Sequence, residues 1–352
     1  MPAISSNHAD KRGVTARNAL SCQKLRGRQM RRPLLVLLAI LFFVPTVAGA
    51  SPALISVTYN ASEDNPQAIG AAQLEKTFRA HAERRVVLDL LAGSSVGSEG
   101  ALVTAVQQGA ADICVVAGLA VSSVVPELGV FDVPFLFRDS AHAKAVVEGP
   151  IGRAIAAKFP EHNLVLLAIG EQGFRNLTNS KVAVRTPADL QGLKVRILNN
   201  DVYKMTFKAL GAEPVPMDYP LVYDALKEGR IDGQENPLGS IASNRMYEVQ
   251  KYVSLTQHVF GITLFLMNKQ TYESLDAADV VAFTEAARAG AEATRVAIAQ
   301  SEAKNLELLK NKGMTVVDTV DRDAFRASLA SLEPEFEKRF GKAFLDDIRA
   351  AH

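Results

Sequence analysis

The side chain in this sequence best suited to chemistry is the guanidinium of Arg196. It lies in the segment Lys194–Leu198, where residue types alternate as they do along a strand. Alternation places Val195 and Ile197 on one face and Arg196 on the other, so we expect a rigid element to display it. A guanidinium presents planar, permanently charged donors that match a carboxylate in a bidentate manner. The residues alone allow two interpretations: capture of an organic anion, or an ordinary ion pair with an internal acid.

A helix-start signature precedes this strand. Thr186 offers a capping hydroxyl, Pro187 suits the first helical position, and Asp189 places an acid in the first turn. Gly192 ends the short turn. We therefore expect a brief helix that leads directly into the strand with Arg196.

One motif points to catalysis instead. Gly93–Gly97 matches the G-x-S-x-G elbow of serine hydrolases, with Ser95 as the nucleophile. A triad also needs an acid and a histidine that the fold brings together, and only His258 lies, weakly, in a suitable loop. The pentapeptide arises easily in a Gly- and Ser-rich turn, so a secreted serine hydrolase is an unfavoured alternative.

Other catalytic and metal-binding patterns do not occur in the sequence. It contains no Walker phosphate loop, no His-Glu-x-x-His, no paired cysteines and no G-x-G-x-x-G after a strand. We therefore expect no cofactor, no metal and no enzymatic activity. This expectation fits a protein that binds a small molecule and hands it over.

Residues 1–50 are typical of an export segment. A pair of arginines precedes the eleven-residue apolar run Leu34–Val44, and small residues up to Ala50 provide a cleavage site, which indicates a secretory signal peptide. The run is too short to span a bilayer, which takes ~20 residues; an uncleaved anchor is the alternative. Met30 stands directly before the arginines, so we expect translation to begin there and residues 1–29 to be an incorrectly assigned extension.

Removing that segment changes the charge balance. The whole chain carries 39 Lys and Arg and 38 Asp and Glu; eight of the bases and one of the acids lie in residues 1–50, which leaves a net charge of −6. That balance argues against nucleic acid as a partner and gives no attraction to anionic lipid. Cys114 is the one remaining cysteine, and its apolar surroundings predict a buried side chain without a disulfide partner.

The first half of the exported chain alternates strands and helices. Residues 55–59, 86–91 and 111–116 are predicted strands, the third apolar enough for a buried parallel sheet, and helices are expected to start at Pro66 and after Ser98. This alternation predicts an α/β fold with a doubly wound sheet and a ligand site beyond the carboxyl ends of its strands. The loops at those ends are 60–65, 94–99 and 117–123.

The second half is more helical. Ile241–Tyr252 has mixed helical spacing, Ile262–Met267 reads as a strand that crosses back to the first half, and Asp321–Phe340 as a last amphipathic helix. The alanine-rich segment Ala277–Lys312 would span ~54 Å as one helix; two shorter helices broken at Gly290 are the alternative. Roughly 300 residues of this kind suffice for two domains.

Six short motifs occur in one order along the chain. They are Gly-Phe-Arg (173–175), Pro-Ala-Asp-Leu-Gln-Gly-Leu-Lys-Val-Arg (187–196), Leu-Gly-Ala-Glu-Pro-Val-Pro-Met (210–217), Val-Tyr-Asp-Ala-Leu (222–226), Asp-Gly-Gln-Glu-Asn-Pro (232–237) and Glu-Val-Gln-Lys-Tyr (248–252). Together they resemble the solute-binding subunit of TRAP transporters, the DctP-type family, over essentially everything after residue 51. The resemblance implies a two-lobed, periplasmic-binding-protein-like α/β fold, each lobe a sheet flanked by helices, with a long helix bracing both.

The resemblance also implies an organisation and a function. Lobe 1 is expected to comprise residues 51–172 and 262–301, and lobe 2 residues 173–261 and 302–352. A small organic acid would be captured by its carboxylate between the lobes and delivered to a membrane permease with a small and a large subunit. We expect a periplasmic monomer; a binding protein that reports its ligand to a receptor is the alternative.

The matched motifs imply six ligand-binding residues. Arg196 corresponds to the family's carboxylate-pairing arginine, Arg175 to a second arginine on the ligand side, and Asn236 to an asparagine that hydrogen-bonds the carboxylate. Tyr219 stands where the family places an aromatic residue against the ligand. The resemblance implies that polar contacts from the first lobe come from Asn60 and Glu99.

Three positions depart from the family pattern. Leu221 replaces a glutamate common before Val-Tyr, so any interaction of that acid is lost. Ala117 and Ala120 stand where sialic-acid binders of the family carry a glutamate and an arginine, which argues against sialate. Gln172 and the polar first-lobe loops suit a hydroxylated acid such as a uronate or aldonate. A C4-dicarboxylate is the alternative, and aromatic or branched keto acids stay open.

Overall fold

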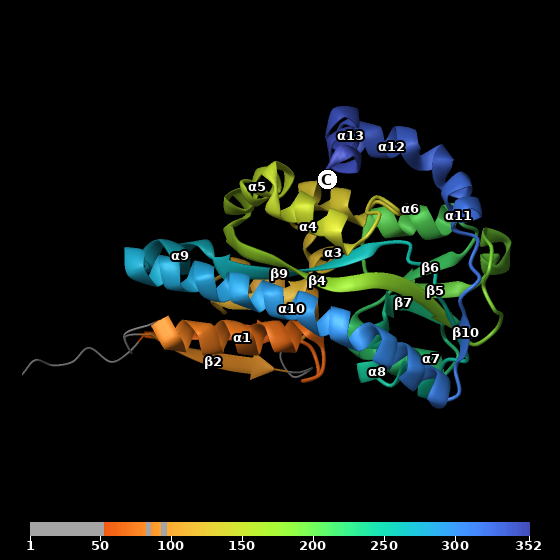
Figure 1. The fold of residues 1–352 in the computed structure, drawn as a ribbon, viewed down its shortest axis with the longest axis horizontal. Coiled ribbons are helices and arrows are strands. Elements are labelled where there is room, and N and C mark those ends of the chain that lie inside the picture. The colour runs from red at the N-terminus through yellow and green to blue at the C-terminus, as the bar shows by residue number, and fades with distance from the viewer. Residues whose placement is uncertain (1–52, 82–85, 93–96) are drawn as a thin grey trace, which may run out of the picture. The chain divides into compact units, whose positions relative to one another are not determined.

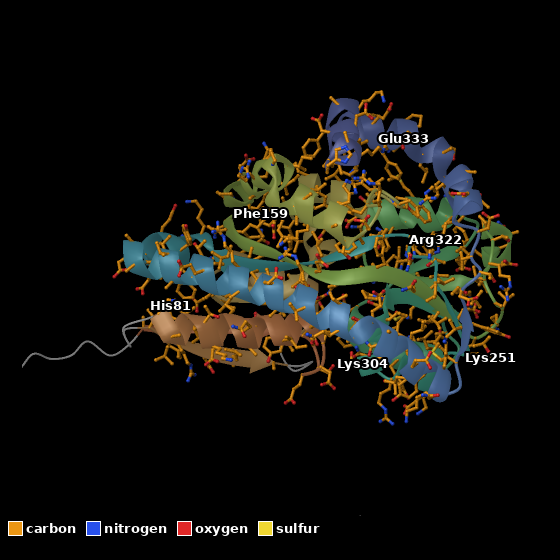
Figure 2. The ribbon with its side chains drawn as sticks, viewed as in Figure 1. His81, Phe159, Lys251, Lys304, Arg322 and Glu333 are labelled. Atoms are coloured by element: carbon orange, nitrogen blue, oxygen red, sulfur yellow. The ribbon has the colours of Figure 1, made fainter. Side chains whose placement is uncertain are left out.

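The structure is a computed structural model that describes residues 53–81, 86–92 and 97–352. The expected signal peptide, the start at Met30 and the hydrolase motif with Ser95 lie outside the described residues. Within the described part, no helix is both long and apolar enough to cross a membrane. Exposed charged side chains such as Lys251 and Lys304 lie on the outside, whereas Phe159 is buried (Figure 2).

Ten strands of the described chain form one mixed sheet (Figure 1). Along it the order is β2-β1-β3-β9-β4-β7-β5-β6; β8 pairs with β4, and β10 pairs with β8. The strands are β1 (Ala53–Tyr59), β2 (Val86–Ala92), β3 (Ile113–Ala117), β4 (Leu164–Asn179), β5 (Lys194–Ile197), β6 (Glu213–Pro216), β7 (Gly233–Pro237), β8 (Tyr252–Ser254), β9 (Phe260–Asn268) and β10 (Thr315–Val317).

The two ends of the sheet are parallel and its centre is antiparallel. The strands β1, β2 and β3 pair in parallel, as do β5, β6 and β7, whereas β9 runs antiparallel to both β3 and β4, and β4 antiparallel to β7. The expectation of a parallel sheet around residues 111–116 is therefore right for one neighbour and wrong for the other. The reason is that β9, which comes from the second half of the chain, lies between β3 and β4 and runs opposite to both.

Helices cover the sheet on both faces. The α-helices are α1 (Pro66–His81), α2 (Glu99–Gln107), α3 (Gly118–Val121), α4 (Ser140–Glu148), α5 (Pro150–Ala156), α6 (Asp201–Ala209), α7 (Val222–Lys227), α8 (Leu238–Ser243), α9 (Lys269–Ser274), α10 (Ala277–Asn311), α11 (Arg322–Leu329), α12 (Glu333–Phe340) and α13 (Lys342–Ala350). The 3-10 helices are η2 (Pro126–Asp132), η3 (Phe159–His162), η4 (Pro187–Leu190), η5 (Tyr219–Leu221), η6 (Met246–Glu248) and η7 (Ala330–Leu332).

The long helix α10 is continuous, so the alternative of a break at Gly290 is wrong. Figure 1 shows it crossing the sheet from α9 at one end to α7 and α8 at the other. Gly290 serves packing instead: a Cβ there would lie 2.7 Å from the carbonyl oxygen of Gly70 in α1 and 2.9 Å from the ring of Phe265. The predicted α/β fold, a central sheet flanked by helices with one long helix, is confirmed.

Two helical predictions in the second half are wrong in their extent. Residues 241–252 do not form one helix, because α8 ends at Ser243 and Tyr252 already begins β8. The last helix is divided into α11, η7 and α12, and α13 follows after Gly341. Pro334 lies in the first turn of α12, where its missing N–H is tolerated, whereas inside a longer helix it would remove a hydrogen bond and clash with the preceding turn.

In the part of the chain that the structure describes, apolar side chains fill four buried clusters around the sheet. In one of them the rings of Phe78 and Phe283 stack 4.1 Å apart and join α1 to α10. Cys114 is buried and makes no disulfide, as predicted. These clusters give the strands that carry polar side chains a rigid support.

Candidate functional site

Strand β5 brings Arg196 into the interior, where its side chain is 1 % exposed. The Nε donates to the carbonyl oxygen of Met217 at 2.8 Å, but the Nη2 is buried and has no hydrogen-bond partner. Among the described residues Arg196 makes no ion pair with a carboxylate. A buried donor without a partner is costly, so this atom is a candidate position for an acceptor from outside the chain.

Tyr219 and burial define the electrostatics around this guanidinium. Its ring centroid lies 5.4 Å from Cζ of Arg196, and its hydroxyl is buried without a partner. Burial lowers the pKa of Arg196 to about 10, against the opposing charge of Glu235, so the side chain is still a cation at neutral pH. Burial also raises the pKa of Tyr219, which keeps its phenol neutral and able to donate.

All six ligand-binding residues that the sequence predicted line one narrow cavity. It has about 30 Å³ of room for water-sized solutes, far less than the ~300–1,000 Å³ of typical ligand pockets. The side chains around it come from β4, β5, β7 and the loops and helices that follow strands. Its lining residues are Asn60, Ala61, Asn65, Gln67, Glu99, Ala117, Gln172, Arg175, Arg196, Leu198, Tyr219, Asn236, Ser240 and Asn244.

Arg175 lines the same cavity, but its guanidinium already donates to an internal acid, Glu235. Its Nε donates to Glu235 Oε2 at 2.5 Å, and its Nη2 donates to Glu235 Oε1 at 2.8 Å and to Asn236 Oδ1 at 3.0 Å. Glu235 also contacts His258 at 3.3 Å. This group holds Asn236 at the cavity wall, so the two arginines differ: one is paired within the chain and the other is open.

Glu235 is the residue of this group that the sequence analysis missed. It is completely buried, which by itself would raise its pKa, but the charge of Arg175 and the hydrogen bonds from His258 and Arg175 together lower the pKa. The signal was available, because Glu235 stands directly beside Asn236 on the strand that pairs with the one carrying Arg175.

Asn60 and Glu99 are held by hydrogen bonds to other segments of the chain. Glu99 Oε1 accepts from Gln67 Nε2 at 2.6 Å and from the backbone N–H of Ala117 at 2.8 Å. The side-chain amide of Asn60 donates to the carbonyl oxygen of Gly97. Both side chains are thereby fixed at the cavity wall, where the predicted polar contacts would be made.

Four further polar residues at the cavity were not predicted: Asn65, Gln67, Ser240 and Asn244. Gln67 lies in the first turn of α1, directly beyond the carboxyl end of β1. Ser240 and Asn244 lie four residues apart at α8, a spacing that puts two side chains on one helix face. In both cases the signal was a polar residue in the helix that follows a strand.

A larger hollow of about 530 Å³ lies between α5, β4 and α10. Arg295, a partly buried arginine at this hollow, is already paired with Glu148 at 2.9 Å, Glu171 at 3.2 Å and Glu292 at 2.9 Å. The open donor of Arg196 therefore makes the narrow cavity the stronger candidate, although it is the smaller of the two.

Among the described residues, the histidine that the sequence analysis considered for a catalytic triad has other partners. His258 is held between Glu235 and Thr256, whose hydroxyl lies 2.8 Å from its Nδ1, and Ser95 lies outside the described residues. In the part of the chain that the structure describes, no group of three His, Cys, Asp or Glu side chains could hold a metal ion.

Comparison with known proteins identifies the family. Residues 57–339 match the family model DctP, described as bacterial extracellular solute-binding protein, family 7. The chain belongs to this family. Within it, a solute-binding protein of Verminephrobacter eiseniae is 39 % identical over 86 % of this chain and 90 % of its own. The 2,3-diketo-L-gulonate-binding periplasmic protein YiaO of Escherichia coli is 33 % identical over 78 % of this chain and 83 % of its own.

Solved structures of TRAP periplasmic solute-binding proteins share the fold. One from Bordetella bronchispeptica, with density assigned to pantoate, has a TM-score of 0.83 at 39 % identity and covers 85 % of this chain and 99 % of its own. One from Polaromonas, bound to D-erythronate, has a TM-score of 0.83 at 33 % identity with the same coverage. This DctP-family chain is therefore a TRAP-type solute-binding protein, as the sequence motifs predicted, and it has the fold of these structures, a central sheet flanked by helices with one long helix.

Proposed function

We propose that this protein captures a small organic acid by its carboxylate at Arg196 and delivers it to the membrane subunits of a TRAP transporter. The observation that carries the proposal is the buried, charged and unpartnered Nη2 of Arg196 at a polar cavity. An arriving carboxylate supplies the missing acceptor and the missing negative charge. Tyr219, Asn236 and Arg175 would support it from the same wall, and Asn60 and Glu99 would contact the other end of the ligand.

The ligand class is a sugar acid or a C4-dicarboxylate. Relatives and structural neighbours carry names that include 2,3-diketo-L-gulonate and D-erythronate. The polar lining supplies both donors and acceptors for such molecules. Binding by positioned polar groups needs no bond to be made or broken, so the protein acts as a non-enzymatic carrier.

The proposal places capture between two lobes. Residues 51–172 and 262–301 would form one lobe and residues 173–261 and 302–352 the other, with the ligand enclosed when they close, as in other two-lobed binders. Enclosure removes water and strengthens the charged contacts. The protein would work in the periplasm as a monomer after removal of its signal peptide, with a small and a large membrane subunit as its permease partner.

Arg196→Ala tests the proposal directly. A thermal-shift screen of organic acids against the mature protein first identifies acids that raise the melting temperature. The variant should lose that rise, because losing a buried charged partner costs about 2–5 kcal/mol of binding free energy. The matched control is Arg230→Ala, since Arg230 is half exposed and pairs with the exposed Glu228 away from the cavity. An unchanged ligand-induced shift in the Arg196 variant would refute the assignment.

A further inference from the structure

Strand β4 has an irregularity at the cavity. In its pairing with β9, Glu171 lies opposite Ile262 and Gly173 opposite Gly261, so Gln172 is an extra residue without a partner in the register. Gly173 has φ +87°, a conformation that suits glycine. Bulges of this kind re-aim side chains and occur often at functional sites. Here the bulge carries Gln172 to the cavity, where its side chain is 8 % exposed.

Gln172 and Glu99 give this site oxygen acceptors in addition to its cationic end. The Oε1 of Gln172 is buried and has no hydrogen-bond partner. Glu99 is fixed through its Oε1 by Gln67 and Ala117, and its Oε2 takes part in neither contact. A buried acceptor needs a donor, and a carboxylate at this position could only add acceptors.

From this we infer that the ligand is a monocarboxylate that carries hydroxyl groups, and that Gln172 recognises one of these hydroxyls by accepting its hydrogen bond. The inference rests on the proposed function and narrows it. The acid end of the ligand would meet Arg196, and its hydroxyls would donate to Gln172 Oε1 and Glu99 Oε2.

The same geometry disfavours a second carboxylate. At the Glu99 end it would meet a like charge, which is unfavourable where water is excluded. It would also leave Gln172 Oε1 without a donor, and sites built to hydrogen-bond a ligand hydroxyl reject analogues that lack it. A C4-dicarboxylate should therefore bind more weakly than a hydroxylated acid of equal length.

Three four-carbon acids test the inference: D-erythronate with one carboxylate and three hydroxyls, succinate with two carboxylates, and butyrate with one carboxylate and no hydroxyl. Calorimetric dissociation constants should rank erythronate tightest by at least about tenfold. Gln172→Met should weaken erythronate by about tenfold and leave butyrate nearly unchanged. Glu99→Gln should narrow the gap between succinate and erythronate. Gln270→Met, at an exposed position, is the matched control and should change none of these values.

The outcomes separate this inference from the proposed function. If succinate binds the wild-type protein as tightly as erythronate, or if Gln172→Met weakens erythronate and butyrate equally, the inference is wrong while capture at Arg196 stands. If Arg196→Ala leaves binding of every acid intact, the proposed function itself fails. The wild-type ranking of the three acids holds as a test even where a variant does not fold.

Discussion

At the scale of single residues, the site contrasts two buried arginines. Arg175 has a complete internal partner in Glu235, whereas Arg196 keeps an unpartnered Nη2. Burying a cation without a partner costs free energy of folding. The open position of Arg196 therefore lowers the stability of the ligand-free protein, and a bound anion would offset that loss. Arg175 in turn organises Asn236. The fold thus uses one guanidinium for structure and offers the other to a ligand.

The paired arginine leads to a stability prediction. Glu235→Gln would leave the Arg175 cation buried without its counter-charge, so we expect the free energy of unfolding to fall by about 3–5 kcal/mol, measured by urea denaturation. Glu228→Gln is the matched control, because Glu228 forms an exposed pair with Arg230 and surface pairs contribute at most about 1 kcal/mol. Equal effects of the two substitutions would show that the buried pair is not a stabilising element.

At the scale of elements, close packing of α1 on α10 depends on glycine. Gly290→Ala should lower the free energy of unfolding by about 1–3 kcal/mol, although alanine favours helices by about 1 kcal/mol, because its Cβ would be within 3 Å of the Gly70 backbone. Gly100→Ala in α2 meets nothing within 4 Å and should leave stability unchanged or raise it. A more stable Gly290 variant would contradict the packing argument.

A second link between elements depends on a buried acid. Asp132 at the end of η2 accepts from the hydroxyl of Ser122, after α3, at 2.6 Å and from the amide of Asn200, which caps α6, at 2.7 Å. Burial raises the pKa of Asp132 to about 6, although both hydrogen bonds and the charge of Arg175 oppose the shift. The Asp132 side chain therefore links the helices that follow β3 and β5 by hydrogen bonds. Its burial disfavours the charged form.

The sign of the pH effect follows from this raised pKa. The folded protein binds the Asp132 proton more tightly than the unfolded chain, so this group's stabilising contribution is present below pH ~4 and is lost as the pH rises through about 6. Asp132→Asn should remove that trend. The difference in unfolding free energy between wild type and variant should change by about 1 kcal/mol between pH 5 and pH 7, in favour of the wild type at pH 5. A difference independent of pH would exclude titration of this group.

At the scale of the whole molecule, the cavity is too narrow for a sugar acid to enter from solution. Its volume of about 30 Å³ and its walls, which come from both proposed lobes, fit a closed form. Because a ligand could not enter this form, we expect the ligand-free protein to open in solution. Small-angle scattering should then show a radius of gyration that falls when a bound acid is added to the wild type. Arg196→Ala should show no change with the same acid, and identical wild-type scattering with and without it would contradict closure.

Local patterns in the sequence predicted the local structure well. Thr186 and Asp189, predicted as the cap and the first-turn acid of a short helix, form a capping box at η4. Ser98 caps α2, and β5 follows where alternation placed it. These features depend on neighbours within a few residues. The break before α12 was not predicted, although Pro334 is present in the sequence. A proline in the first turn of a helix cannot be told from one inside a helix unless the start of the helix is known.

The sequence by itself determined the family, the α/β fold and the six residues that meet at one cavity, because each can be recognised from short runs of residue types along the chain. Only the tertiary structure decided which arginine is open, because Glu235, Arg175 and His258 come together from separate strands and loops. It also decided the antiparallel centre of the sheet and the bulge that carries Gln172 to the cavity. Pairing, register and burial are long-range properties, and a burial cost or an unpartnered donor exists only once distant segments have packed together.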